Sequence, residues 1–288
     1  MQTIIQLFIN GIMVGGIYGL ISMGLTLIFG VMKIINFAHG EFFMLSMYGT
    51  FWLFHLLGIH PYLSVFLMVP IMFAIGLVTQ RGLIQRLIDA PDIAQIFVTV
   101  GLSIALQNGV LFAWSADYRG IKIPFATKSL LLGGMNFSLS RLLVFGVTVG
   151  VMLFFLLFLK RTSLGRAMRA TSQNWKAAWL MGVNIHKIYL IAFAIGSSCV
   201  GLAGAMIIPI YSVFPTVGSY FVLVAFVVVV LGGMGDIMGA FLAGLIVGLV
   251  ETFSGFFLAP QLGPMVVFVF FVLILLFKPS GLMGKMQF

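Results

Sequence analysis

Long apolar runs, separated by polar, glycine or proline residues, dominate the pattern of this chain. They lie near residues 4–30, 41–58, 62–79, 93–114, 141–159, 188–210, 219–232, 237–258 and 262–278. A helix needs about 20 apolar residues to cross about 30 Å of hydrocarbon. The run 219–232 is shorter, which is typical of a broken or re-entrant helix surrounded by protein or by a water-filled cavity. We therefore predict an all-α polytopic membrane protein of about eight or nine transmembrane helices, folded as one transmembrane domain over residues 1–288.

Composition supports this prediction. The chain is 62% hydrophobic and 7% charged, whereas soluble chains carry about a quarter charged residues. The net charge of +9 does not indicate nucleic-acid binding, because basic residues of membrane proteins gather in cytoplasmic loops. The single Cys199 lies in an apolar run, which excludes a disulfide scaffold. The first apolar run has no basic residues ahead of it, so we interpret it as a span rather than a cleaved signal peptide.

The basic residues also predict orientation. The loop 160–187 contains six Lys or Arg residues and no acid, so we place it in the cytoplasm. Counting spans from this loop puts 80–92 and 278–288 on the same side. The N-terminus and the loop 115–140 are then expected outside, although that loop contains Arg119, Lys122 and Lys128.

Glycines recur at helical spacing in the first and eighth runs. They are Gly11, Gly15 and Gly19 in the first, and Gly235, Gly239, Gly244 and Gly248 in the eighth. Such stripes let helix backbones approach closely in lipid. Tight helix packing is the simpler interpretation, and a thin wall beside a substrate path is the alternative.

The stretch INFAHGEFF, from Ile35 to Phe43, places three polar side chains between two apolar runs: Asn36, His39 and Glu41. A zinc site would need three or four suitable ligands, and no nucleophile elbow accompanies the histidine. Two interpretations remain. The stretch is either a turn at the membrane surface, in which Glu41 complements the dipole of the next helix, or a helix break. In a break, Asn36 and His39 would face a permeation route.

Other polar residues fall inside predicted spans. Glu251 lies in the eighth, where an acid costs about 2.5–3.5 kcal/mol and should face the bundle interior. It would either bond to a neighbouring helix or contact substrate. Gln107 and Asn108 in the fourth span raise the same question. The candidate translocation residues are therefore Asn36, His39, Glu41, Gln107, Asn108 and Glu251.

The loop stretch from Arg166 to Gly182 has an amphipathic pattern. As one helix it would place Trp175 and Trp179 on one side and several basic residues on the other. Such a helix either lies flat on anionic lipid or inserts into a groove of a soluble partner.

Four stretches together resemble one family, the permease subunits of branched-chain amino-acid ABC transporters. They are Tyr18–Phe43, which ends in the family's N-F-A-H-G signature before Glu41, and Thr99–Asn108, Ser163–Ile188 and Val230–Glu251. The resemblance covers nearly the whole chain in the same order and spacing.

The resemblance implies an all-helical subunit of the bacterial inner membrane with no enzymatic site or cofactor of its own. It would work with a second, related permease, two cytoplasmic ATPases and an extracytoplasmic solute-binding protein. The loop helix would then be the coupling helix that docks onto an ATPase, through Arg166, Arg169, Trp175, Ala177, Ala178 and Gly182. Relatives often carry acids ahead of the paired alanines, whereas this chain has Gln173, Asn174 and Lys176.

Two other classes remain as alternatives. A stand-alone channel or secondary carrier would need its own coupling-ion site, usually carboxylates at broken helices. An intramembrane enzyme would need an assembled acid–base or nucleophile set. The cargo stays open among Leu, Ile or Val, another amino acid, and a small amide such as urea.

Overall fold

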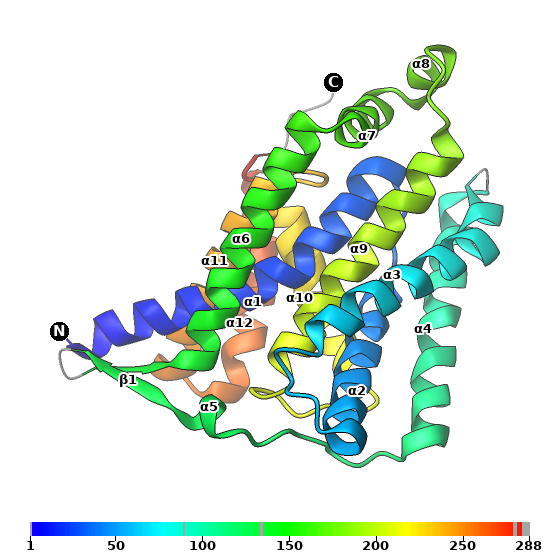
Figure 1. Cartoon of the computed structure of the whole chain (residues 1–288). Helices are drawn as coiled ribbons and strands as arrows, with labels where there is room; N and C mark the ends of the chain where they lie inside the picture. The colour runs from blue at the N-terminus through cyan, green and yellow to red at the C-terminus, as the bar shows by residue number, and fades with distance from the viewer. Residues whose placement is uncertain (1, 89, 133–134, 279–280, 284–288) are drawn as a thin grey trace.

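The computed structural model describes residues 2–88, 90–132, 135–278 and 281–283. Its long helices form one bundle around a shared hydrophobic core (Figure 1). The helices are α1 (Gln2–Met32), α2 (His39–Leu57), α3 (Val65–Gly82), α4 (Asp92–Trp114), α5 (Pro124–Thr127), α6 (Leu139–Arg161), α7 (Ser163–Gln173), α8 (Trp175–Leu180), α9 (Ile185–Ile207), α10 (Val217–Gly232), α11 (Ile237–Phe257) and α12 (Gly263–Phe277). Short 3-10 turns follow α3 (Ile84–Leu87) and precede α12 (Pro260–Leu262).

Each of the nine apolar runs contains a helix, so the all-α prediction is confirmed. In the described part of the chain, seven helices are long and apolar enough to cross a membrane: α1, α3, α4, α6, α9, α11 and α12, with α3 and α12 counted together with their 3-10 turns. The other two are α2, with 19 residues, and α10, with 16. These two lie among the long helices, α2 against α9 and α10 against α1.

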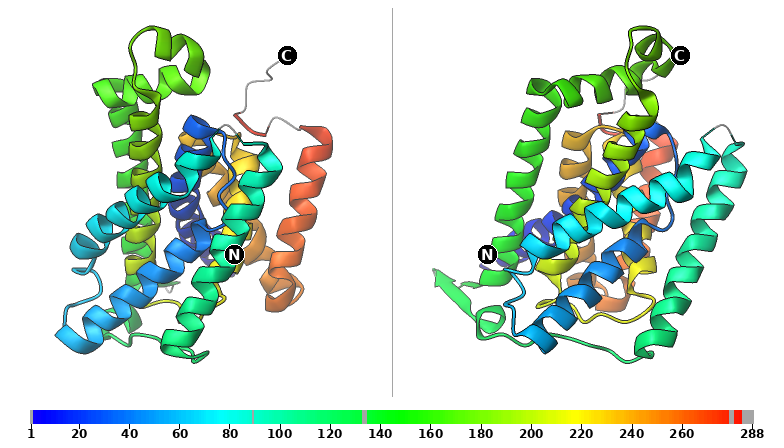
Figure 2. Two further views of the ribbon diagram at one scale, coloured as in Figure 1. Left: turned by 90° about the vertical axis from the view of Figure 1, so that its right-hand side faces the viewer. Right: turned by 45° about the vertical axis from the view of Figure 1, so that its right-hand side comes forward.

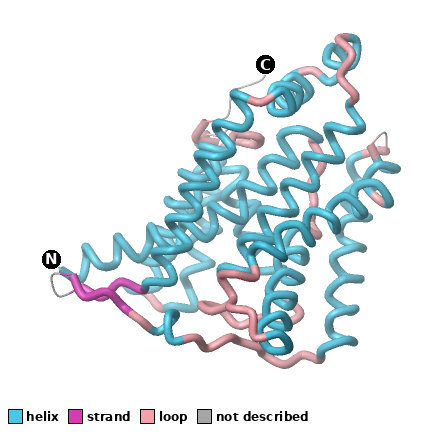
Figure 3. The backbone as a smooth tube through the Cα atoms, viewed as in Figure 1, coloured by secondary structure: helices cyan, strands magenta, loops and turns pink. Residues whose placement is uncertain are grey.

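The two ends of the bundle contain different segments. Figure 2 shows α7, α8, the turn between α3 and α4, and the end of α12 toward one end. The N-terminus and a small hairpin lie toward the other. This hairpin, magenta in Figure 3, pairs β1 (Ser129–Leu132) antiparallel with β2 (Met135–Ser138), with Ser129 opposite Ser138. The grouping agrees with the predicted sides, but the apolar pattern gives no sign of the hairpin.

The glycine stripes lie where helices meet. A Cβ added at Gly15 would come to 2.6 Å from the carbonyl oxygen of Gly244, and one at Gly244 to 2.7 Å from the Cα of Gly19. Gly11 and Gly248 continue this contact between α1 and α11. Gly239 lies against Gly232, and Gly235 against Gly30. Along this stripe the backbones of α1 and α11 therefore approach closely.

The prediction of one continuous helix from Arg166 to Gly182 is wrong. The chain leaves the helical conformation at Asn174, with φ −155° and ψ 99°, and α8 begins at the next residue. The cause is the Asn174 side chain, whose Oδ1 accepts a hydrogen bond from the backbone N–H of Ala177 at 3.0 Å. An asparagine offers this cap in place of helix continuation.

Candidate functional site

The stretch between α1 and α2 is a break inside the bundle. The chain turns at Lys33, where φ is 61°, and stays non-helical until His39. Asn36 has no exposed surface, and its Oδ1 accepts a hydrogen bond from the N–H of Ala38 at 3.1 Å. Thr99 on α4 donates to the carbonyl of Ile35 at 3.2 Å. Backbone that is not helical at membrane depth needs such partners.

A second break, residues 208–216, separates α9 from α10. Within it Val213 exchanges two backbone hydrogen bonds with Arg119, at 2.9 and 2.7 Å. After the break, α10 begins at Val217. Its first turn meets the first turn of α2, because a Cβ added at Gly40 would overlap the backbone of Gly218. Two short helices thus begin at one place inside the protein.

Glu41, in the first turn of α2, lies at this meeting point and reaches across to α4. Its Oε1 accepts hydrogen bonds from Ser103 Oγ at 2.9 Å and from Gln107 Nε2 at 2.7 Å. Gln107 also donates to Ser219 Oγ on α10 at 2.8 Å. A Cβ added at Gly218 would come to 2.5 Å from Oε2 of Glu41. The carboxylate therefore links α2, α4 and α10.

The depth of this cluster follows from α4. Ser103 is eleven residues from Asp92 and eleven from Trp114, the two ends of that helix. At about 1.5 Å per residue it is about 16 Å from either end. The break before α2 is thus near the middle of the span, not at a surface turn. The starts of both short helices bring their positive dipole ends to Glu41.

His39 is enclosed by neighbouring helices. Its side chain has no exposed surface, and Nε2 lies 3.2 Å from the carbonyl oxygen of Ile21 on α1. A Cβ added at Gly24 would come to 3.3 Å from the imidazole ring. His39 therefore packs against α1 next to the break, and its side chain takes no part in the hydrogen bonds of the Glu41 cluster.

Glu251 belongs to a different cluster, on the other side of the first turn of α10. Its Oε1 accepts a hydrogen bond from Tyr220 at 3.0 Å, and the hydroxyls of Tyr220 and Tyr18 are 3.2 Å apart. A Cβ added at Gly263, the first residue of α12, would come to 3.2 Å from its Cγ. The structure does not bring Glu251 together with Glu41. Asn108 is also separate, since it is exposed and donates to Ile104 of its own helix at 2.8 Å.

The sequence analysis missed Ser103, Ser219 and Tyr220. A signal for the first was present, because polar residues recur every four positions along α4: Gln95, Thr99, Ser103 and Gln107. Residues four apart share one face of a helix. Gln95 donates to the carbonyls of Leu87 and Ala90 in the turn before α4, whereas Thr99 on the same face donates to Ile35 in the break. No comparable pattern marks Ser219 or Tyr220.

The α7–α8 segment projects at one end of the bundle (Figure 1). α7 buries Gly165, Met168 and Thr171 and exposes Arg166 and Arg169. On α8, Ala178 is buried and Ala177 is exposed. Trp175, Trp179, Leu180 and Met181 are 50, 63, 79 and 85% exposed. Gly182 follows with φ 85°, a conformation that favours glycine.

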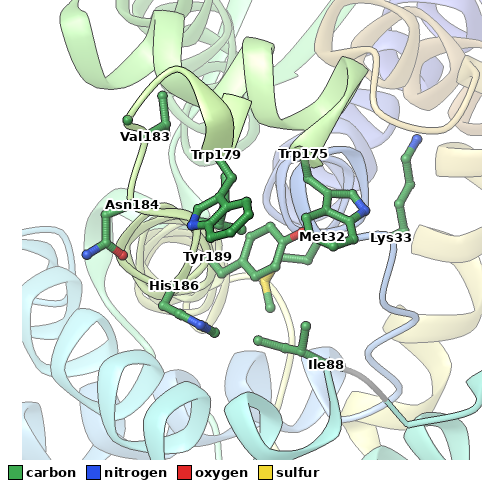
Figure 4. A pocket seen from close by; sticks show the side chains of 11 residues that line it. Met32, Lys33, Ile88, Trp175, Trp179, Val183, Asn184, His186 and Tyr189 are labelled. Atoms are coloured by element: carbon green, nitrogen blue, oxygen red, sulfur yellow. The ribbon is translucent and has the colours of Figure 1, made fainter. Parts of the chain in front are cut away.

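A cavity of about 700 Å³ lies beneath α8. In Figure 4, Trp175 and Trp179 extend over it from α8, while Tyr189 and Ile88 lie beneath them. Lys33, at the end of α1, lines one side and His186 the other. The His186 Nδ1 contacts the Gln85 side chain. The cavity therefore connects α8 to the ends of α1 and α9 and to the turn before α4.

Among the described residues, no group of three or more His, Cys, Asp or Glu side chains could hold a metal ion. The Glu41 cluster contains one carboxylate with hydroxyl and amide partners. This arrangement can bind and orient a small polar molecule.

Comparisons with known proteins agree with the geometry. Residues 7–277 match the family described as "Branched-chain amino acid transport system / permease component". The chain is 33% identical over 294 residues to the high-affinity branched-chain amino acid transport system permease protein BraD of Pseudomonas aeruginosa, covering 98% of this chain and 96% of that protein. It is 30% identical over 296 residues to the corresponding LivH protein of Escherichia coli, with the same coverage.

A more distant relative is the ribose import permease protein RbsC of Haemophilus influenzae, 29% identical over 203 residues, 66% of this chain and 61% of that protein. No solved structure gives a significant match. The full-length matches favour a transport permease over a stand-alone carrier or an enzyme. The chain is a multi-pass membrane protein that belongs to the family of permease components of branched-chain amino acid transport systems.

Proposed function

We propose that this chain is the membrane-spanning permease subunit of an ATP-driven importer in the bacterial inner membrane, and that it carries branched-chain or related small amino acids. The family and the full-length relatives support this function. The ATPases would supply the energy, a second related permease would complete the path, and an extracytoplasmic solute-binding protein would deliver the cargo.

The path, in this proposal, runs along the face formed by α4 and the start of α10. Ser103, Gln107 and Ser219 are half-buried on this face, near the middle of the span. Polar side chains at this depth are costly unless they face protein or water. Glu41 lies behind them, whereas Asn36 and His39 hold the break in place. We leave Asn108 and Glu251 out of the path because neither contacts this cluster.

The α7–α8 segment would dock onto a cytoplasmic ATPase. The observation that carries this part is the exposed apolar tip of α8, with Trp179, Leu180 and Met181 together at the projecting end of the bundle. Exposed apolar patches of this kind mark protein interaction sites. The apolar end of a short helix can insert into a groove of a partner protein in this way.

Trp179→Asp tests the docking. It places a charge on the exposed tip without disturbing buried residues, so we expect loss of ATPase co-purification and of uptake, with the permease still in the membrane. Leu130→Asp is the matched control, because Leu130 is also exposed but lies in the hairpin toward the other end. Normal ATPase recovery and uptake with Trp179→Asp would contradict the proposal.

A further inference from the structure

The carboxylate of Glu41 has only half of its hydrogen-bonding capacity filled. Oε1 accepts from Ser103 and Gln107, whereas Oε2 is buried without a partner. An ionised carboxylate has about four acceptor sites on its two oxygens. A buried acceptor without a partner is costly, so Oε2 is open to a donor from outside this chain.

A positively charged group would complete this site. Within the described residues, no Lys, Arg or His side chain forms an ion pair with Glu41, and the contacts of its carboxylate come from a hydroxyl and an amide. The two helix starts stabilise a negative charge in part. A full counter-charge would still lower the free energy of a carboxylate at this depth.

Half-buried side chains of α4 and α10 lie next to this site. Gln107 lies across the carboxylate and bridges it to Ser219. Both residues are half-buried, so they border the surface of the described chain. Gln107 is therefore a side chain that would have to move to expose Glu41, which has no exposed surface.

We propose that Glu41 binds the ammonium group of the amino-acid cargo midway across the membrane, an inference that rests on the proposed function. An ammonium group has three donors, which suit Oε2 together with the oxygens of Ser103 and Gln107. The first turn of α10, with the Ser219 hydroxyl, suits the carboxylate end of the same zwitterion, since helix starts bind anions. A metal ion would need more ligands than the one carboxylate here.

Charged thiol reagents on the assembled importer test this proposal. Ser103→Cys in a Cys199→Ser background puts one thiol beside Glu41. Aminoethyl methanethiosulfonate is the cationic probe, and sulfonatoethyl methanethiosulfonate is the anionic one, each corrected for its rate with a free thiol. We expect the cation to react faster by at least about tenfold, because a unit charge about 5 Å away acts strongly at an effective dielectric of about 20.

Glu41→Gln keeps the shape and an oxygen acceptor but removes the charge. It should abolish the preference for the cationic probe, while Glu251→Gln, a matched change in the other cluster, should preserve it. In the chain with its native Ser103 and Cys199, Glu41→Gln should also lower amino-acid uptake by about tenfold, with unchanged recovery of the ATPases.

The outcomes separate the two proposals. No labelling at position 103 in any nucleotide state would contradict the path itself. Labelling without charge preference, or a preference that survives Glu41→Gln, would overturn the ammonium site and leave the path standing. The first measurement uses native Glu41, so an absent charge preference would overturn the ammonium site even if Glu41→Gln fails to insert.

Discussion

Two glutamates flank the first turn of α10 and differ in almost everything except their side chain. Glu41 reaches this turn through Gln107 and Ser219, and Glu251 reaches it through Tyr220. Each keeps one buried oxygen without a partner. Chemistry alone would give them the same role.

The structural surroundings of the two glutamates nevertheless indicate different roles. Glu41 begins a short helix opposite the start of another, and half-buried polar side chains separate it from the surface. Glu251 lies within the continuous helix α11, bonded to a tyrosine and close to the first residue of α12. A glutamate next to a helix break, such as Glu41, is therefore a better candidate for the path than a glutamate inside a continuous helix, such as Glu251. Three experiments test this difference between the two glutamates.

The largest effect should come from Gly218→Leu. The new side chain would meet the Glu41 carboxylate and the Gly40 backbone, so the two short helices could no longer begin together. We expect almost no monodisperse protein in detergent. Gly150→Leu on α6 is the control, since a Cβ there meets nothing within 4 Å. A melting temperature unchanged by Gly218→Leu would show that the two helix starts are not packed as described.

Gln107→Leu should have a smaller effect, on transport rather than folding. It removes the bridge between Glu41 and Ser219 and puts an apolar group on the path, so we expect uptake to fall by about tenfold. Asn108→Leu makes the same kind of change at the next residue, away from the cluster, and uptake should stay within about twofold. Equal losses in both variants would argue against a path confined to one face of α4.

Tyr220→Phe should have the smallest effect. It deletes the hydroxyl that donates to Glu251, which should lower the free energy of unfolding by about 1–3 kcal/mol. Thermal denaturation in detergent measures this change, and uptake per folded molecule should be unaffected. The opposite result, lost uptake with unchanged stability, would move Glu251 into the path and remove the contrast between the two acids.

Much of this architecture could be predicted from the sequence. Apolar run length predicts the helices, because burial in lipid requires it. The four-residue glycine spacing predicts close backbones, and Gly15 and Gly244 lie in such a contact. A helix end that depends on a single side chain is harder to predict from sequence, as the cap at Asn174 shows.

The candidate site was less predictable. Glu41 and Gln107 are 66 positions apart, and a single sequence does not contain the register that brings them together. INFAHGEFF indicated a polar break, but not its depth, which depends on packing of α2 against α10. The expectation that His39 faces the route assumed an open break, whereas Gly24 and Ile21 of α1 lie against its ring.

The opposed starts of α2 and α10 also affect how the protein responds to the membrane potential. From their meeting point the two helices run toward opposite ends of the bundle (Figure 1), so their dipoles point in opposite directions and largely cancel across the bilayer. Their dipoles would therefore contribute little to the charge that a movement of both helices carries through the field. The Glu41 carboxylate on α2 would be the main charge that the field acts on, at about 2.3 kcal/mol per 100 mV for a full crossing.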